Sequence, residues 1–453
     1  MAEPSPAPDI VLIHCHDLGR MLGAYGARVP SPRIDAFAND AVRFDGAFAT
    51  APQCSPSRAA LFTGRYPHET GVLGLTHLGW DLGPDVRHLA AILAEQGYRT
   101  ELLGVHHESR VRPDLEVAAR LGFDTVDTLG PSHPERRAEL VADRAVAALE
   151  RLRGAGPFYL QVGFLEPHRL HDPDPDATIM GFTGGWIEPE PSDQIEVPPY
   201  LEPDAGSRTE LAELAGAIRS VDSQIGRVLD AIDRLGMSER TIVVLTTDHG
   251  LALPGAKGTL RDPGLETALI LRAPSLGWTG GVVVEGLASN VDIVPTLLDA
   301  IGSPIPPESR GASLRPAIAA GATSRSEIFG EFTYHDYYDP ARCIRTDRYK
   351  LILHFDRTLP HSAASTQSWR PRSTPLDRRL AHPPALVELY DLAVDPEERI
   401  NLADRPERAI VVRALLGRLR EWMRDTDDPL LDGVPPSPAH GGAIALLEGA
   451  AHA

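Results

Sequence analysis

The sequence predicts an α/β protein: a large, mostly parallel sheet flanked by helices, followed by a smaller α+β unit built on an antiparallel sheet. Short apolar runs alternate with helical patterns in residues 1–324, as expected for parallel strands joined by helices. From residue 325 onward, several strand patterns follow one another, which is typical of an antiparallel sheet. The chain of 453 residues, 42% of them hydrophobic, is long enough to bury one large core and a smaller one.

The first unit, residues 1–324, contains five clear apolar strand patterns. They cover residues 10–14, 42–49, 100–104, 158–164 and 242–246. Helical patterns lie between them at about 33–40, 87–96, 136–152 and 208–235, and the last ends at Gly236, a residue suited to a helix C-terminus. A further helix is expected from Pro56, because proline fits a first helical turn, where its missing N–H would have no partner.

The second unit, residues 325–453, contains four strand patterns and one helical pattern. The strands are expected at 328–332, 342–345, 349–353 and 388–392, and a helix at about 405–424 would pack on their sheet. Residues 357–386 are rich in Pro, Arg, Ser and His and predict a long, mobile surface loop, with a lid or an oligomer contact as alternatives. The Pro-, Gly- and Ala-rich tail after Asp425 is expected to be flexible.

Composition narrows the function. The chain has 44 Lys and Arg against 63 Asp and Glu, a net charge of −19, which argues against broad binding of nucleic acid or an anionic membrane. An anionic substrate would therefore need a local positive pocket. Three cysteines give no disulfide framework, no signal-like N-terminus is visible, and no apolar run approaches the ~20 residues of a membrane span. These features predict a soluble, cytoplasmic protein, and a homo-oligomer remains open.

Polar side chains that can bind a metal ion or transfer a proton follow all five predicted strands. Open α/β sheets bind their ligands at the carboxyl ends of the strands. One such residue can occur in a surface loop by chance. Five strands in succession that are each followed by such residues are better explained by a shared functional site. The segments are His14–Asp17, the turn that leads to Cys54, His106–Glu108, Glu166–Arg169 and Thr247–Gly250, with Lys257 shortly afterwards.

Cys54 lies in the run Cys54-Ser55-Pro56-Ser57-Arg58. An isolated cysteine is usually a small buried residue, but residues 52–65 resemble the signature of the sulfatases, C-x-P-x-R. In that family a formylglycine-generating enzyme oxidises the cysteine to an aldehyde. The resemblance implies nucleophilic catalysis by the hydrated aldehyde, which attacks sulfur through one hydroxyl and expels sulfate through the other. A thiolate would be left as a stable thiosulfate ester.

The resemblance extends over most of the chain. The order of motifs, from the first strand to residues 388–402, is similar to that of sulfatases in the alkaline-phosphatase superfamily, which implies an alkaline-phosphatase-like fold. Within the family the chain looks most like the sulfamidase (heparan N-sulfatase) branch. The segments that suggest this branch are 164–169, 197–201 and 256–260.

The resemblance also implies one divalent metal ion. Asp17, Asp248 and His249 resemble its ligands, joined by an oxygen of the modified Cys54. The family usually has two adjacent acids where this chain has His16-Asp17. The resemblance to the family implies calcium, whereas the two imidazoles of His16 and His249 favour manganese or another transition metal. Both possibilities stay open, as does a role for His16 outside the ligand set.

Four further residues match the family's catalytic groups. Arg58, one helical turn after Cys54, would hold the aldehyde hydrate, where the helix N-terminus adds N–H groups for an anion. Lys257 would bind the sulfate. His168 would bind sulfate or protonate the leaving group, and His107 would act as a general base, because an unperturbed histidine titrates near neutral pH.

Neighbours of these histidines are candidates for substrate binding. The family pattern Gly-Lys-x-His reads Gly104-Val105-His106-His107 here, so His106 would take over part of the role of the missing lysine. Arg169 and Glu166 would contact polar groups of the substrate, although a salt bridge between loops explains them equally well. Candidates for the pocket wall are His14, Cys15, His77 and His335.

The leading hypothesis is therefore a formylglycine-dependent sulfatase that cleaves a sulfate ester or a sulfamate. Its substrate would be small, with N-sulfoglucosamine or another sulfated sugar implied by the branch. One alternative is a phosphonate or phosphate ester hydrolase of the same superfamily. The other is a catalytically degenerate protein that only binds sulfated ligands, which the replacements at Val105 and His16 would favour.

Overall fold

A sheet of eight strands, seven of them parallel to one another, forms the centre of the larger unit. The computed structural model describes residues 7–130, 134–171, 180–358, 371–441 and 443–444. Within them the strands run in the order β10-β2-β9-β8-β1-β5-β3-β4, and only β9 is antiparallel to its neighbours. The strands are β1 (Asp9–Cys15), β2 (Val42–Phe48), β3 (Arg99–Gly104), β4 (Thr125–Asp127), β5 (Phe158–Gly163), β8 (Thr241–Thr247), β9 (Leu269–Arg272) and β10 (Val282–Ser289).

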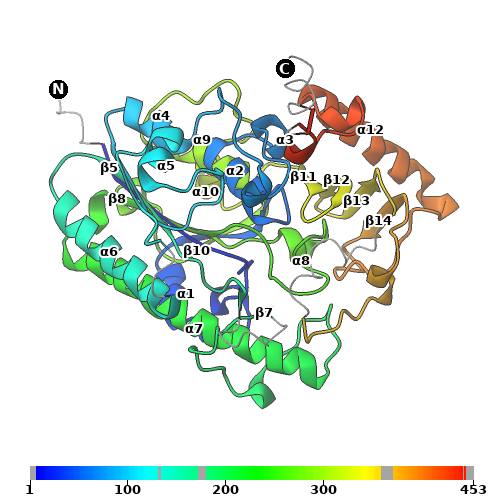
Figure 1. Ribbon diagram of the computed structural model, residues 1–453, viewed down its shortest axis with the longest axis horizontal. Coiled ribbons are helices and arrows are strands. Elements are labelled where there is room, and N and C mark those ends of the chain that lie inside the picture. Colours follow the sequence, from blue (N-terminus) through cyan, green and yellow to red (C-terminus); the bar gives the residue numbers. More distant parts are fainter. Residues whose placement is uncertain (1–6, 131–133, 172–179, 359–370, 442, 445–453) are drawn as a thin grey trace.

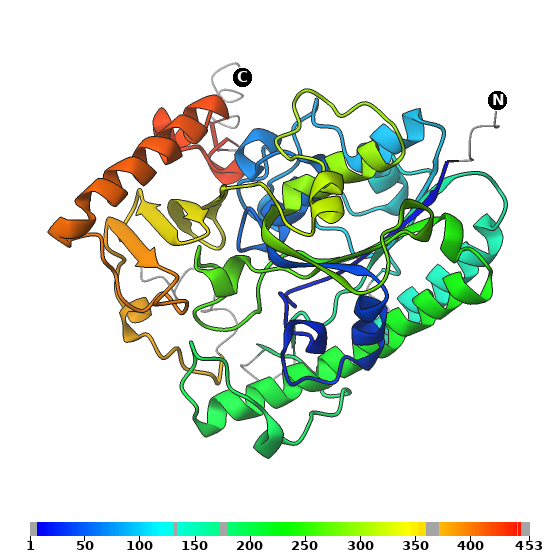
Figure 2. The same cartoon turned by 180° about the vertical axis from the view of Figure 1, so that it is seen from behind.

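Helices cover both faces of this sheet (Figures 1 and 2). One face carries α1 (Pro32–Asn39), α6 (Arg137–Leu152) and α7 (Ala205–Arg234). The other carries α2 (Cys54–Thr63), α4 (Leu89–Glu95), α5 (Asp114–Leu121), α9 (Ile293–Ala300) and α10 (Arg315–Ala320). Because both faces are buried, the central strands are continuous apolar runs rather than alternating ones. In the part of the chain that the structure describes, no helix is both long and apolar enough to cross a membrane.

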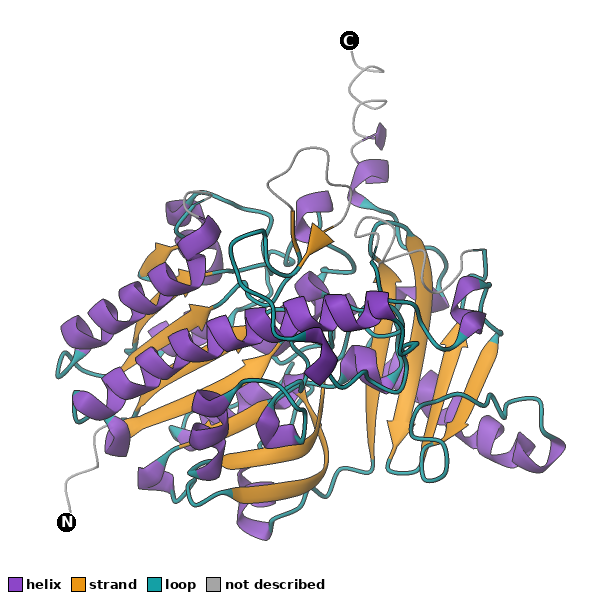
Figure 3. Cartoon of the chain, turned by 90° about the horizontal axis from the view of Figure 1, so that it is seen from below, coloured by secondary structure: helices purple, strands orange, loops and turns teal. Residues whose placement is uncertain are grey.

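The second unit is a four-stranded antiparallel sheet beside the first (Figure 3). Its strands are β11 (Glu327–Tyr334), β12 (Tyr338–Thr346), β13 (Tyr349–His354) and β14 (Val387–Asp391). The helix α12 (Ala409–Asp425) packs on this sheet through Leu415, Leu419, Trp422 and Met423. The remaining short elements are α3 (Pro67–Thr70), α8 (Asp262–Leu265) and the pair β6 (Leu170–His171) and β7 (Met180–Gly181).

The fold class predicted from the sequence is confirmed, and the differences are local. The helix expected from Pro56 begins at Cys54, because the extended backbone of Gln53 ends the preceding turn and Ser57 N–H already donates to Gln53 O at 3.1 Å. Five strands, β4, β6, β7, β9 and β10, have no counterpart among the predicted ones. β4 and β9 span only three and four residues, too short for a reliable apolar pattern.

Parts of the two segments expected to be flexible are packed. Residues 359–370 of the predicted loop 357–386 lie outside the described residues. After them, Ser373 N–H donates to Glu210 at 3.0 Å and Leu376 N–H to Tyr200 O at 2.8 Å. In the tail, Asp428 forms a buried ion pair with Arg342. Composition does not reveal these contacts, because each buried partner lies far away in the sequence, and the flexibility of the two segments stays a prediction.

A buried ion network joins the two units next to α8. The ammonium group of Lys350 lies 3.0 Å from Glu398 and also contacts Asp262, whose N–H donates to Glu398 at 2.6 Å. Removing one partner of such a network leaves a buried charge without compensation, which costs about 3–5 kcal/mol. The network therefore fixes α8, and with it the segment that carries Lys257, against the second sheet.

Candidate active site

The strand ends that were predicted to converge do so. β1, β2, β3, β5 and β8 all point in the same direction, so their carboxyl ends meet at one edge of the sheet. There Asp17, Cys54, Asp248 and His249 each offer a ligand atom within 4.8 Å of the others. His16 and His168 form a second such group with Asp17 and Cys54.

Cys54 is the first residue of α2, where the helix presents N–H groups without intrahelical partners and the positive end of its dipole. Its sulfur lies 3.3 Å from Lys257 Nζ and 3.4 Å from His249 Nε2. Burial raises the pKa of the Cys54 thiol, but Lys257 and three surrounding histidines lower it well below its usual range. Position 54 is therefore a strongly anion-stabilising environment.

Asp17 links the two sides of the cluster. Its backbone has a φ of 53°, in the left-handed region that Asp tolerates better than most residues, and its N–H donates to Asp248 Oδ1 at 2.9 Å. Both of its carboxylate oxygens lie 2.8 Å from Lys257 Nζ. Burial raises the pKa of Asp17, but Lys257 and His168 lower it well below the usual range, so the carboxylate is ionised.

The donor set fits a divalent metal ion. His249 Nδ1 lies 2.9 Å from the carbonyl oxygen of Gly250, which can only accept, so Nδ1 carries the proton and Nε2 faces the cluster. Both nitrogens of His16 are buried and form no hydrogen bond with described residues, although Nδ1 lies only 3.2 Å from Asp248 Oδ2. Two ionised carboxylates and two imidazoles thus converge, and such a set suits manganese or another transition metal better than calcium.

A third group, His68, Glu331 and Asp428, has metal-like spacing but is an ion-pair network. His68 Nδ1 bonds Glu331 at 2.8 Å and Nε2 lies 3.1 Å from Thr426 O, so both ring nitrogens are used. Arg342 bonds both oxygens of Asp428. The network ties α3 to the second unit.

Arg58 is fully buried one helical turn after Cys54. Its Nε donates to Asp248 Oδ2 at 3.1 Å, and its Nη1 lies 3.1 Å from Nδ1 of His14. Burial and the charge of Arg58 lower the pKa of His14 well below its usual range, so this ring stays neutral and accepts from Arg58. The sequence suggested that His14 lines a pocket wall. In the structure His14 instead orients Arg58.

The rings of His107 and His168 both lie close to His16, with centroids 5.6 Å and 5.3 Å from its own, and both interact with the Cys54 thiol. Burial lowers the pKa of His107 to about 4, so the ring is neutral and able to accept a proton at neutral pH. His168 Nδ1 bonds its neighbour's carbonyl oxygen at 2.6 Å, which directs Nε2 to Asp17 at 3.7 Å. Both rings are thus placed for proton transfer.

The three residues predicted to contact the substrate, Arg169, Glu166 and His106, have different surroundings in the structure. The side chain of Arg169 is buried, pairs with Glu210 at 2.6 Å and lies over the ring of Phe182, which is the salt bridge that the sequence left open. Glu166 is also buried, and burial raises its pKa. His106 is buried at the end of β3, with Nδ1 lacking a hydrogen bond to the described residues. Substrate contacts by Arg169, Glu166 and His106 stay predictions.

Several supporting residues were missed at the level of sequence. Ser57 donates to the carbonyl oxygen of Asp248, and Asn290 donates to the backbone oxygen of Ser57 at 3.1 Å. Glu108 accepts from the N–H of His107 at 2.7 Å. Ser57 and Glu108 lie inside the motifs, so their position was a usable signal. Asn290 is 233 residues away from its partner, and no local pattern reveals it.

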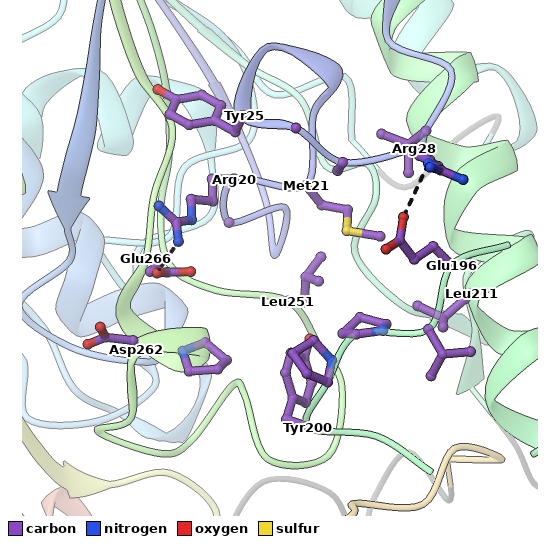
Figure 4. A pocket seen from close by; sticks show the side chains of 18 of the residues that line it. Arg20, Met21, Tyr25, Arg28, Glu196, Tyr200, Leu211, Leu251, Asp262 and Glu266 are labelled. Carbon is purple, nitrogen blue, oxygen red and sulfur yellow. Dashed lines mark ion pairs between the residues drawn. The ribbon is translucent and has the colours of Figure 1, made fainter. Parts of the chain in front are cut away.

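A cavity of about 410 Å³ opens between residues 19–29 and 195–200, and none of the cluster residues lines it (Figure 4). Its walls are mostly apolar, with Met21, Tyr200 and Leu251 among them. The arginines at its rim are already compensated, since Arg20 pairs with Glu266 at 2.5 Å and Arg28 with Glu196 at 3.5 Å (Figure 4). We therefore place a bound anion at the Cys54 cluster and not in this cavity.

His16 provides a test of the metal. In the His16→Asp variant we expect the amount of bound calcium to rise relative to bound manganese, because a carboxylate replaces an imidazole. Elemental analysis after equilibration with equal Ca²⁺ and Mn²⁺ measures the ratio directly, and His106→Asn is the matched control. An unchanged metal ratio would place His16 outside the ligand set.

Comparison with known proteins agrees with this geometry. The family model described as Sulfatase matches residues 8–303, and that described as N-sulphoglucosamine sulphohydrolase, C-terminal, matches residues 256–362. The chain is 27% identical to the N-sulphoglucosamine sulphohydrolase of Homo sapiens over 477 residues, which cover 94% of this chain and 92% of that protein.

Solved structures share the fold. A protein solved in complex with its substrate D-glucosamine-2-N,6-O-disulfate matches 93% of this chain and 98% of its own, with a TM-score of 0.69 and 20% identity. A phosphonate monoester hydrolase from Silicibacter pomeroyi matches 92% of this chain and 96% of its own, with a TM-score of 0.71 and 22% identity. At these identities the likeness establishes the fold and leaves the substrate open.

Proposed function

Because the chain belongs to the sulfatase family, we propose that it releases sulfate from a small sulfated sugar, with a formylglycine at position 54 as the nucleophile. Its enzymatic class is hydrolysis of sulfate esters or sulfamates. The observation that carries the proposal is the meeting of Cys54, Lys257, His107 and His168 around two ionised carboxylates. A similar relative is named for N-sulphoglucosamine, which supports a sulfated glucosamine as substrate.

The modified residue and the metal supply chemistry that thiols and imidazoles lack. A formylglycine-generating enzyme would convert Cys54, and the hydrated aldehyde offers one hydroxyl to attack sulfur and a second to expel sulfate. A divalent ion, held by Asp17, Asp248 and His249 beside His16, would neutralise sulfate charge and lower the pKa of the attacking hydroxyl.

The side chains of the cluster then divide the remaining work. Lys257, 3.3 Å from the sulfur of Cys54, is placed to hold a sulfate oxygen next to the nucleophile. Arg58 fixes Asp248 and the start of α2. His168, whose side chain is 24% exposed, would protonate the leaving oxygen or nitrogen, whereas the neutral His107 would accept a proton when sulfate departs.

Two measurements test this function together. Mass spectrometry of the tryptic peptide Phe44–Arg58 from the native host should show loss of one sulfur and two hydrogens and gain of one oxygen, with an aldehyde that hydrazines trap. A panel of N-sulfoglucosamine, glucosamine 6-sulfate, 4-nitrophenyl sulfate and a phenylphosphonate ester should show release of sulfate from the sugars. An unmodified thiol with no sulfate release, or faster cleavage of the phosphonate, would contradict the proposal.

A further inference from the structure

The tip of the β11–β12 hairpin, His335–Tyr337, belongs to the second unit but is attached to the first. Tyr334, at the end of β11, donates its N–H to Leu73 O at 3.1 Å. Its ring also contacts Trp80, with centroids 5.1 Å apart. The hairpin tip is therefore fixed on the segment of residues 73–80 rather than projecting freely from its own sheet.

That segment leads directly to the nucleophile. Thr76 donates its N–H to Ser55 Oγ at 3.1 Å, and Ser55 follows Cys54 in α2. The next residue, His77, is stacked on His107 with ring centroids 6.4 Å apart. His107 in turn interacts with the Cys54 thiol. Residues 73–80 thus contact the hairpin through Leu73 and Trp80, and the surroundings of Cys54 through Thr76 and His77.

Asp336 is the acidic group of the hairpin tip. Its side chain is 31% exposed, and its Oδ2 lies 3.4 Å from Nδ1 of the buried His335. His335 lowers the pKa of Asp336, burial opposes this, and the charges of His77 and Lys257 lower it further, so the carboxylate is ionised. His77 and Lys257 are therefore close enough to Asp336 for their charges to act on its carboxylate.

The negative charge of Asp336 is unsuited to binding the sulfate group of a substrate, but it suits the hydroxyl and amino groups of a sulfated sugar. The side chains that surround the Cys54 sulfur include the cation Lys257 and several histidines, which suit an anion. A carboxylate repels sulfate but accepts hydrogen bonds from hydroxyl and ammonium groups. We infer that Asp336, which lies beside His335, binds the hydroxyl or amino groups of the sugar that bears the sulfate. This inference rests on the proposed function of the same site.

Asp336→Asn tests the inference with paired substrates. We expect kcat/KM on glucosamine 6-sulfate to fall about 10- to 100-fold, mainly through KM, because an uncharged amide accepts less strongly from the sugar. Activity on 4-nitrophenyl sulfate, which lacks those groups, should stay within about twofold of the wild type. Glucose 6-sulfate separates the two donors: an equal loss on both sugars assigns hydroxyl binding, and a loss on glucosamine 6-sulfate alone assigns ammonium binding.

Asp347→Asn is the matched control, since Asp347 is an exposed acid at the other end of β12. It should change none of these activities. Equal losses on the aryl and sugar sulfates in Asp336→Asn, or no loss on either, would overturn the inference while leaving the sulfatase function intact. If the wild-type enzyme releases sulfate from 4-nitrophenyl sulfate but from no sugar, both the proposed sugar substrate and the proposed role of Asp336 are wrong.

Discussion

Replacing Cys54 with alanine should reduce sulfate release at least about 10⁴-fold, in effect to the background rate, because it removes the nucleophile itself. The alanine side chain cannot be oxidised to an aldehyde, and no described residue beside it offers a hydroxyl in its place: the groups that contact the sulfur are Asp17, His16, His107, His168, His249 and Lys257. Steady-state kinetics on the best sulfated sugar measure the loss.

Cys343 is the matched control for Cys54. Both cysteines are free and buried, but burial raises the pKa of the Cys343 thiol to about 12, and Cys343 lies on β12 in the second unit. The Cys343→Ala variant should keep the wild-type kcat with at most a modest loss of stability. Full activity in Cys54→Ala, with an intact fold shown by circular dichroism, would refute covalent catalysis at position 54.

Replacing Lys257 with methionine should lower kcat/KM about 10²- to 10³-fold, because it removes the preorganised cation next to the nucleophile. The ammonium group lies 2.8 Å from both oxygens of Asp17 and 3.3 Å from Cys54 Sγ, inside a buried site where such a charge is effective. Methionine preserves the length of the side chain without its charge. Lys257→Arg should restore part of the activity if charge is what matters.

Lys350 is the control for Lys257, because its replacement should affect stability and not catalysis. It is also buried and paired with acids, Asp262 and Glu398, but at the contact between the two units. Lys350→Met should cost about 3–5 kcal/mol of stability in urea unfolding, while the folded fraction keeps the wild-type kcat. If Lys257→Met lost only stability and kept kcat/KM, the proposed sulfate contact would be wrong.

Local patterns were sufficient for the elements and for most of the site. The strands β1, β2, β3, β5 and β8 were recognisable as buried apolar runs, and parallel strands bring their carboxyl ends together whatever the details of packing. For this reason the convergence of Asp17, Cys54, Asp248 and His249 was predictable before any coordinates. The catalytic roles assigned to these residues stay predictions.

Partners far apart in the chain were beyond the reach of such patterns. Arg169 lies beside His168 in sequence, yet its charge is used by Glu210, 41 residues later, on α7. A local pattern records how one segment is buried, but the choice of partner depends on which side chains the finished packing brings within hydrogen-bonding distance. For the same reason, the contacts of His14 with Arg58 and of Asp428 with Arg342 could not be predicted from the sequence.

The sequence by itself determined the fold class, the position of the candidate nucleophile and the edge of the sheet at which the candidate site forms, because each depends on short-range periodicity or on a contiguous motif. Only the tertiary structure decided which partner each buried charged residue has. It paired Arg169 with Glu210 and placed the hairpin tip with Asp336 near His77. Both outcomes follow from long-range packing, in which buried charges are stable only where the fold supplies a counter-charge.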